Sequence, residues 1–100
     1  MTRLSVVNNS SLVNIKGLSS LTKIIGNAYS ISIYGNDNLQ SLAGFENLKQ
    51  VEGQASFAFN KSLNNFCALK PLFLQQPGVS FITEGNLANP KKEDVIANCN

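Results

Sequence analysis

Residues 28–53, AYSISIYGNDNLQSLAGFENLKQVEG, repeat the residue pattern of positions 4–26, LSVVNNSSLVNIKGLSSLTKIIG. The two copies align on Leu12 and Leu39, and a third copy aligns on Leu63, with spacings of 27 and 24 residues. Apolar, asparagine and glycine positions coincide on both sides of these anchor leucines. A period of about 20–30 residues with fixed apolar positions is typical of a solenoid, whose stacked coils bury their apolar stripes in one core.

The first part of each copy predicts a β-strand. Apolar and polar residues alternate in LSVVNN, ISIYGN and ASFAFN, and this period of two indicates a strand with one face in the core. Stacked copies would pair these strands in parallel, about 4.8 Å apart. Their outer face would carry one serine per coil, at Ser5, Ser32, Ser56 and Ser80. A further 24 residues place Val79 and Phe81 as the inward pair of a fourth strand.

An asparagine stands three residues before each anchor leucine, at Asn9, Asn36 and Asn60. The chain has to turn inward there, so we expect these side-chain amides to bond backbone groups of their own coil and the next, as a ladder. Three asparagines in ordinary surface turns are the simpler alternative. In the fourth copy this position holds Glu84, which predicts that the ladder ends there or that the register shifts.

The segments after the anchor leucines complete the predicted coil. GLSSLTK and GFENLKQ indicate one helical or 3₁₀ turn, and KIIG and QVEG indicate a short inward strand. The stretch NPKKEDVIANCN predicts a capping helix with Asn89 as its N-cap and Pro90 as its first residue. No such cap precedes Leu4–Val7, so we expect this edge to pack on an upstream coil or on a second copy of the chain, as a homodimer.

The predicted fold is therefore α/β leaning to β, with short parallel strands in a right-handed, β-helix-like solenoid of three to four coils. One hundred residues are enough for one such domain or for part of one, and we expect a single domain over residues 1–100. Its coils, which we call units 1 to 4, span about 4–26, 27–53, 54–76 and 77–88, and its cap spans 89–100.

Composition argues against several classes of partner. Charged residues make up 14% and the net charge is +2, with the basic residues dispersed, so we predict no nucleic-acid partner. No run of roughly 18 apolar residues is present, so we predict no membrane insertion. The N-terminus lacks the apolar region of a signal peptide, which fits a cytoplasmic protein or a piece of a larger exported one. We favour the exported piece, because the chain begins inside a repeat.

The sequence also lacks the patterns of enzyme chemistry. It contains no histidine, the commonest general base and metal ligand. Its six carboxylates fall on different faces of the aligned coils, so no acid–base pair is indicated. Neither KGLSSLT nor YGNDN has the ending of a phosphate loop. We therefore predict no catalysis, no cofactor and no metal site.

The repeat I-x-x-N-x-x-L-x-x-L-x-G-[LF]-x-x-L-x-x-[IV]-x-G resembles the receptor L-domain version of leucine-rich repeats. That version occurs in insulin- and EGF-receptor ectodomains and in many bacterial cell-surface proteins. The bacterial kind is the closer one, because the chain has the Phe66–Cys67 step, the segment GNLANP at 85–90 and the terminal Cys99. Departures from the pattern are Ala55, in place of a large inward residue, and Phe59, in place of a polar one. The resemblance implies an extracellular or cell-surface location.

That location bears on Cys67 and Cys99, the two cysteines of the chain. An exported origin favours a disulfide between them, which would clip the C-terminal cap to unit 3. Two buried free thiols in a cytoplasmic chain are the alternative.

One surface remains as a candidate for function. Alternation along the strands predicts that these residues point outward or lie at the adjoining turns: Val7, Tyr34, Ala58 and Ile82, next to Asn8, Gly35, Phe59 and Thr83. Rigid aromatic anchors beside hydroxyls suit protein or glycan ligands, so we predict binding by Ser32, Tyr34, Ser56 and Phe59. The chain would then be a non-catalytic recognition module of a bacterial surface or secreted protein. A structural spacer or stalk without a ligand is the alternative, with the aromatic side chains covered by loops or a partner copy.

Overall fold

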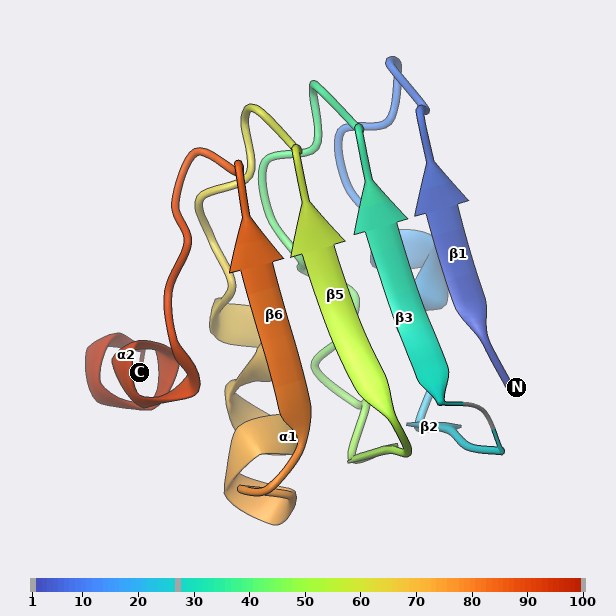
Figure 1. The fold of residues 1–100 in the computed structure, drawn as a ribbon, viewed down its shortest axis with the longest axis vertical. Helices are drawn as coiled ribbons and strands as arrows, with labels where there is room; N and C mark the ends of the chain where they lie inside the picture. The colour runs from blue at the N-terminus through green and yellow to red at the C-terminus, as the bar shows by residue number, and fades with distance from the viewer. Residues whose placement is uncertain (1, 27, 100) are drawn as a thin grey trace.

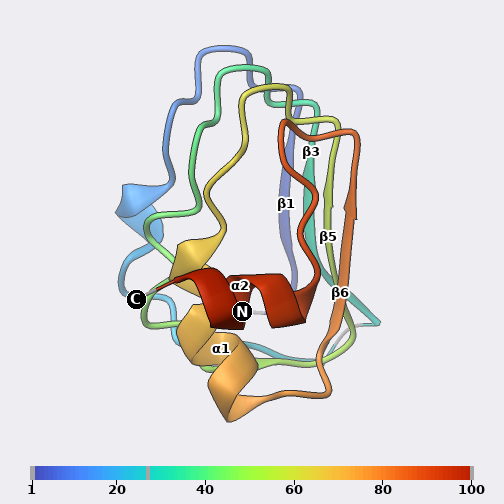
Figure 2. The ribbon, with the colours of Figure 1, turned by 90° about the vertical axis from the view of Figure 1, so that its left-hand side faces the viewer.

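The structure is a computed structural model that describes residues 2–26 and 28–99. It is a mixed α/β fold in which four parallel strands form one sheet, in the order β1-β3-β5-β6 (Figure 1). These strands are β1 (Leu4–Val7), β3 (Tyr29–Tyr34), β5 (Gln54–Ala58) and β6 (Ser80–Glu84). Turns and short helices return the chain on one side of the sheet, so neighbouring strands come from consecutive units (Figure 2).

The first three strands pair residue by residue at the positions that the repeat predicts. Leu4 pairs with Ile31, and Ile31 pairs with Ala55, so the expected parallel strands are confirmed. A bulge between Tyr29 and Ile31 takes up part of the longer spacing between units 1 and 2. Asn27, where we placed the start of unit 2, lies outside the described residues.

The return segments carry short helices and a second, two-stranded sheet. The 3₁₀ helices are η1 (Lys16–Leu18) and η2 (Cys67–Leu69), and the short strands are β2 (Lys23–Ile24) and β4 (Gln50–Val51). The strands β2 and β4 pair in parallel. The helical turn expected at GLSSLTK is present as η1, whereas GFENLKQ forms turns without a helix. In unit 3, η2 continues into α1 (Lys70–Gln75). Pro71 suits the first turn of α1, where a backbone N–H has no partner within the helix, and Leu72 and Phe73 are buried.

The predicted register of the fourth strand is wrong. Ala55 pairs with Phe81 and not with Val79, so β6 is displaced by two residues from the predicted pairing. The Phe81 ring packs against the rings of Phe57 and Phe73, with centroid distances of 5.7 and 4.9 Å. A large ring beside the small Ala55 side chain fills the space that a second small residue would leave empty, and close packing of this kind stabilises a core.

The displacement also changes the outer face of β6. The pairs between β5 and β6 are Gln54 with Ser80, Ala55 with Phe81, Ser56 with Ile82, Phe57 with Thr83 and Ala58 with Glu84. The predicted outward rows are therefore wrong in unit 4. Ile82, and not Ser80, extends the serine row, whereas Glu84 takes the place predicted for Ile82. Thr83 shares the inward face with Phe57 and is half-buried.

Anchor leucines and their apolar neighbours form the core. Leu39 and Leu63 have no exposed area, whereas Leu12 is half-buried, because β1 has a neighbouring strand on one side only. The largest fully buried side chains are Phe45, Phe57, Phe73, Ile24, Ile31, Ile33, Leu39, Leu42, Leu48, Leu63, Leu69 and Leu72. They come from the strands and from the return segments, so the core lies between the sheet and the segments behind it.

The C-terminal helix α2 (Lys92–Asn98) lies across the β6 end of the stack (Figures 1 and 2). Its Val95 side chain is buried in the core and Ile96 is half-buried against it. The apolar side of the last unit is therefore covered, as a capping helix requires.

The predicted start of this helix is wrong. Lys91, and not Asn89, is the N-cap, and its backbone N–H donates to the Asp94 carboxylate at 3.0 Å. The side chain of Asn89 is engaged elsewhere, because its Oδ1 accepts the backbone N–H of Asn86 at 3.0 Å. An amide that terminates one hydrogen-bonded row cannot also cap the helix behind it.

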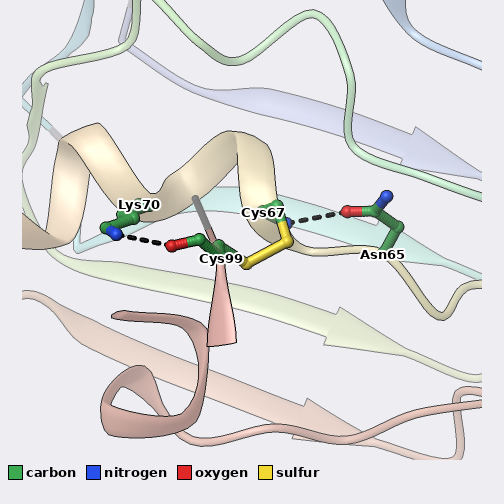
Figure 3. Close-up of a disulfide and its surroundings, with 4 residues drawn as sticks. All are labelled: Asn65, Cys67, Lys70 and Cys99. Atoms are coloured by element: carbon green, nitrogen blue, oxygen red, sulfur yellow. Dashed lines mark hydrogen bonds between the residues drawn. A yellow bond between two sulfur atoms is a disulfide. The ribbon is translucent and has the colours of Figure 1, made fainter. Parts of the chain in front are cut away.

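The predicted disulfide is confirmed, with the sulfur atoms of Cys67 and Cys99 2.02 Å apart (Figure 3). Lys70 Nζ donates to the carbonyl oxygen of Cys99 at 2.5 Å, and Asn65 Oδ1 accepts the Cys67 N–H at 3.0 Å. The end of the chain is thus fixed to the η2–α1 segment by one covalent bond and one charged hydrogen bond.

Removing this disulfide is expected to lower the free energy of unfolding by about 3–4 kcal/mol, because the bond restricts a loop of some thirty residues in the unfolded chain. Urea unfolding of the double variant Cys67→Ser/Cys99→Ser measures the change. Wild-type protein kept reduced is the control and should unfold like the variant. An unchanged midpoint in both would show that the bond does not form.

Candidate functional site

The turns that follow the strands are joined by asparagine side chains. Asn36 Oδ1 accepts the N–H of Asn9 at 3.0 Å, and Asn36 Nδ2 donates to the Val6 carbonyl at 3.0 Å. One unit further, Asn60 Oδ1 accepts the N–H of Asn36 at 3.0 Å, and Asn60 Nδ2 donates to the Ile33 carbonyl at 3.0 Å. Asn36 and Asn60 have no exposed area. Each amide therefore connects its own turn to the strand and turn of the preceding unit.

The row continues in unit 4 through a residue that the sequence analysis did not select. Asn86 Oδ1 accepts the N–H of Asn60 at 3.0 Å, and Asn86 Nδ2 donates to the Phe57 carbonyl at 2.8 Å. Of the two outcomes predicted for Glu84, the register shift is therefore the one observed, and the asparagine row continues into unit 4. The sequence contains a signal for Asn86, because EGN at 84–86 matches YGN at 34–36, which ends in Asn36. Asn9 differs from the other asparagines of the row. It is exposed, and its Nδ2 donates to the Val7 carbonyl of its own unit at 3.1 Å.

One residue in each turn has a left-handed backbone conformation. These residues and their φ angles are Asn8 at 55°, Gly35 at 70°, Phe59 at 56° and Gly85 at 67°. Glycine adopts this region freely and asparagine is enriched in it, but a bulky side chain at positive φ is a genuine outlier. Phe59 therefore occupies a position that the fold would give to glycine.

Large side chains and glycines alternate along this row. The Asn8 amide lies over Gly35, where a Cβ atom would come within 2.3 Å of Asn8 Oδ1. The Phe59 ring lies over Gly85, where a Cβ atom would come within 2.4 Å of the ring. Each glycine thus leaves room for the side chain of the preceding unit.

Two aromatic rings meet on the outer side of the sheet. The ring of Tyr34, from the end of β3, contacts the ring of Phe59 edge to face, with centroids 5.4 Å apart and planes at 69°. Each side chain is 45% exposed. Ser32 and Ser56 pair with each other in the adjacent strands and are half-buried. The structure therefore brings together the residues that the sequence predicted for binding.

Apolar and acidic residues border this pair. Val7 stands beside Tyr34 in the neighbouring strand and is 44% exposed, while Ile82 stands beside Ser56 and is 42% exposed. Glu84 stands beside Ala58 and is exposed. We call the surface formed by Ser32, Tyr34, Ser56, Phe59, Val7 and Ile82 the aromatic face.

Carboxylates elsewhere in the fold hold backbone groups. Glu52 Oε1 accepts the N–H of Gly26 at 2.6 Å, and Glu46 Oε1 accepts the N–H of Gly44 at 2.7 Å. Within residues 2–26 and 28–99, no group of three or more metal-ligating side chains comes together. No helix in the described part of the chain is long and apolar enough to span a bilayer.

No protein-family model, curated protein or solved structure matches the chain. The residues of the chain itself, and chiefly the aromatic face, therefore provide the evidence for its function.

Proposed function

We propose that the chain is a non-catalytic recognition module that binds a protein or a glycan through the aromatic face. The observation that carries this proposal is Phe59, which is half-exposed in a left-handed conformation. Such a conformation disfavours a residue with a side chain by about 1–2 kcal/mol, and Gly35 and Gly85 occupy the same position in neighbouring units without that strain. Strained residues cluster at binding sites, where the contact with a ligand is the reason to keep them.

The chemistry of the aromatic face fits an uncharged, partly apolar ligand. Tyr34 and Phe59 offer two ring surfaces, and the contact between them restricts their motion before a ligand arrives. Hydroxyl groups of Ser32 and Ser56 lie in the adjoining row and can donate or accept hydrogen bonds. Aromatic anchors with hydroxyl groups close by suit either an apolar side chain of a protein or a sugar ring.

We further propose that the fold is a right-handed leucine-rich-repeat solenoid of three to four coils, of the receptor L-domain type. In-register parallel strands and the asparagine row that joins consecutive turns support this assignment. The Cys67–Cys99 disulfide supports an extracellular or cell-surface location, because such bonds persist in oxidising compartments. The parent would then be a bacterial surface or secreted protein.

A titration monitored by nuclear magnetic resonance tests the binding function. Labelled chain is mixed with a panel of soluble oligosaccharides and of peptides, and the signals of Tyr34, Phe59, Ser32 and Ser56 are followed. We expect at least one probe to shift these signals together. The double variant Tyr34→Ser/Phe59→Ser should keep its fold and lose that response.

Two results would contradict the recognition function. A response that persists unchanged in the folded double variant would place binding elsewhere on the chain. The absence of any response across the panel would favour the spacer or stalk, which needs no ligand.

Replacement of Phe59 separates its strain from its contacts. Phe59→Ala and Phe59→Gly both remove the ring, but only glycine relieves the left-handed conformation, so Phe59→Gly is expected to be more stable by about 1 kcal/mol. Urea unfolding measures the difference, and both variants should lose the response of the aromatic face to its probe. Equal stability of the two variants would show that residue 59 is not strained.

A further inference from the structure

Tyr29 faces outward, although alternation along β3 would turn it inward. Ile31 and Ile33 are buried, and a regular strand would place Tyr29, two residues before Ile31, on the same inward side. The bulge changes this, because Tyr29 pairs with Gln54 while Ile31 pairs with the next residue of β5, Ala55. Ala55 is buried on the inward side, so Gln54 and Tyr29 share the outer side, where the Tyr29 side chain is 60% exposed.

The bulge is a fixed part of the fold. Its extra residue is Ser30, which has no exposed area and whose hydroxyl donates to the Glu52 carbonyl. Bulges are a common way to re-aim a side chain beside a functional site. Here the bulge places a second aromatic ring on the outer side of the strand that ends in Tyr34.

Both ends of β3 therefore carry an aromatic side chain on the outer side. Tyr29 is the first residue of the strand, and Tyr34 is the last and contacts the Phe59 ring. The Cα atoms of the two tyrosines lie about 16 Å apart or slightly less, because five residue steps separate them and the bulge shortens the strand. A ligand that touches both rings has to be extended and has to run along β3.

Uncharged polar side chains lie between these two aromatic contacts. Ser32 and Ser56 pair with each other across β3 and β5, which are adjacent in the sheet, and Gln54 pairs with Tyr29 (Figure 1). The described outward positions of β3 and β5 hold no charged residue, and a carboxylate stands only further along the sheet, at Glu84 of β6. This strip matches a neutral ligand, because an acidic one would meet Glu84 and a basic one would find a single carboxylate at the side.

A strip of hydroxyl and amide groups between two rings suits a sugar chain better than a polypeptide. A β-linked sugar with equatorial hydroxyls presents C–H groups on the faces of its ring, which pack on an aromatic side chain, and hydroxyls around its rim, which bond serine and glutamine. A polypeptide anchor needs a pocket that buries it. The short serine side chains between the rings form a shallow surface instead.

We propose that the aromatic face continues along β3 to Tyr29 and Gln54 and binds a neutral, linear, β-1,4-linked glycan that lies along the strand. One sugar stacks on the pair of Tyr34 and Phe59 and another on Tyr29. The sugars between them bond the Gln54 amide and the serine hydroxyls of the aromatic face. This inference rests on the proposed recognition function and adds to it the class of ligand and the second aromatic contact.

Oligomers of β-1,4-linked glucose, mannose and N-acetylglucosamine, from the single sugar to the hexamer, are the probes. They are titrated into the labelled chain while the nuclear magnetic resonance signals of Tyr29, Gln54, Tyr34 and Phe59 are followed. We expect at least one series to shift all four signals. Its affinity should rise by about tenfold or more from the disaccharide to the hexamer, because only a chain that spans the strand joins both contacts in one molecule. Added salt should change this affinity little, because the ligand is neutral.

The variant Tyr29→Ser isolates the second aromatic contact. It should lower the affinity for the hexamer about tenfold and that for the disaccharide no more than about twofold, because the contact at Tyr34 and Phe59 remains. Tyr29→Phe should bind like the wild type, since it keeps the ring. Leu74→Ser is the matched control, because it removes a side chain of the same 60% exposure from α1 and should leave both affinities unchanged.

Three outcomes would overturn the proposal, and they separate it from the recognition function. Equal affinity of the hexamer for Tyr29→Ser and for the wild type, or a response that leaves Tyr29 and Gln54 unshifted, would confine binding to the aromatic face as first defined. A response to peptides and to none of the sugars would keep the recognition function and assign it to a protein ligand. No response to either class of probe would remove both proposals.

Discussion

Replacing Asn60 with alanine is expected to lower the free energy of unfolding by about 3–6 kcal/mol, the largest loss for any single polar side chain of this protein. Its Oδ1 accepts from the N–H and the Nδ2 of Asn36, and its Nδ2 donates to the Ile33 carbonyl and to Asn86 Oδ1. Alanine would leave the buried Asn36 N–H without its partner, at about 1–3 kcal/mol, and would remove three further hydrogen bonds, at about 0.5–1.5 kcal/mol each. Urea unfolding followed by circular dichroism measures the loss.

Asn64→Ala is the matched control for this substitution. Asn64 lies four residues further along the same unit and its side chain is exposed, so its removal should change stability by no more than about 0.5 kcal/mol. If Asn60→Ala unfolded at the same urea concentration as Asn64→Ala, the asparagine row would be an arrangement of surface turns without energetic weight.

Phe57→Ala has the second large effect, an expected loss of about 3–5 kcal/mol. The Phe57 side chain has no exposed area, and its ring contacts the rings of Phe66 and Phe81 at centroid distances of 5.9 and 5.7 Å. Truncation opens a cavity between two aromatic rings that the backbone holds apart, so the site cannot collapse fully. Thermal and urea unfolding of the purified variant measure the change.

Phe59→Ala provides the comparison for this core substitution. It removes the same atoms two residues away, on the outer side, where the ring is 45% exposed, and alanine keeps the left-handed conformation. We expect it to cost less than about 1 kcal/mol. A larger loss at Phe59 than at Phe57 would mean that the Phe57 side chain does not face the core.

Strand pairing in units 1 to 3 could be predicted because it follows directly from the repeat. Positions that recur at a fixed spacing in the sequence become neighbours in the sheet, so Leu4, Ile31 and Ala55 stand side by side. The register of β6 could not be obtained by the same addition, because α1 lengthens the return of unit 3. The match of EGN to YGN carries the correct offset, so a residue motif is a better guide there than a constant period.

The start of α2 shows a second limit of prediction from local pattern. Asn89 and Pro90 have the residue types of an N-cap and a first helical position, yet the helix begins at Lys92. The side chain of Asn89 instead bonds Asn86 and ends the asparagine row. The Asn89 amide could cap the helix or bond Asn86, and the tertiary contact with Asn86 decides between the two. The local sequence around Asn89 does not contain that information.

Much of the aromatic face could be read from alternation, which placed Tyr34 outward beside the serines. Its most informative feature was less apparent, because the left-handed conformation of Phe59 follows only from aligning it with Gly35 and Gly85. A bulky residue that aligns with the glycines of neighbouring units is thus a signal of strain that the sequence already contains.

Contacts among the methyl groups of the anchor leucines test the stacking of units most directly. Nuclear Overhauser effects should connect Leu39 to both Leu12 and Leu63, and none should connect Leu12 to Leu63, because those two belong to units separated by about twice the strand spacing. A direct contact between Leu12 and Leu63, or the absence of any contact to Leu39, would contradict the stacked arrangement on which the aromatic face depends.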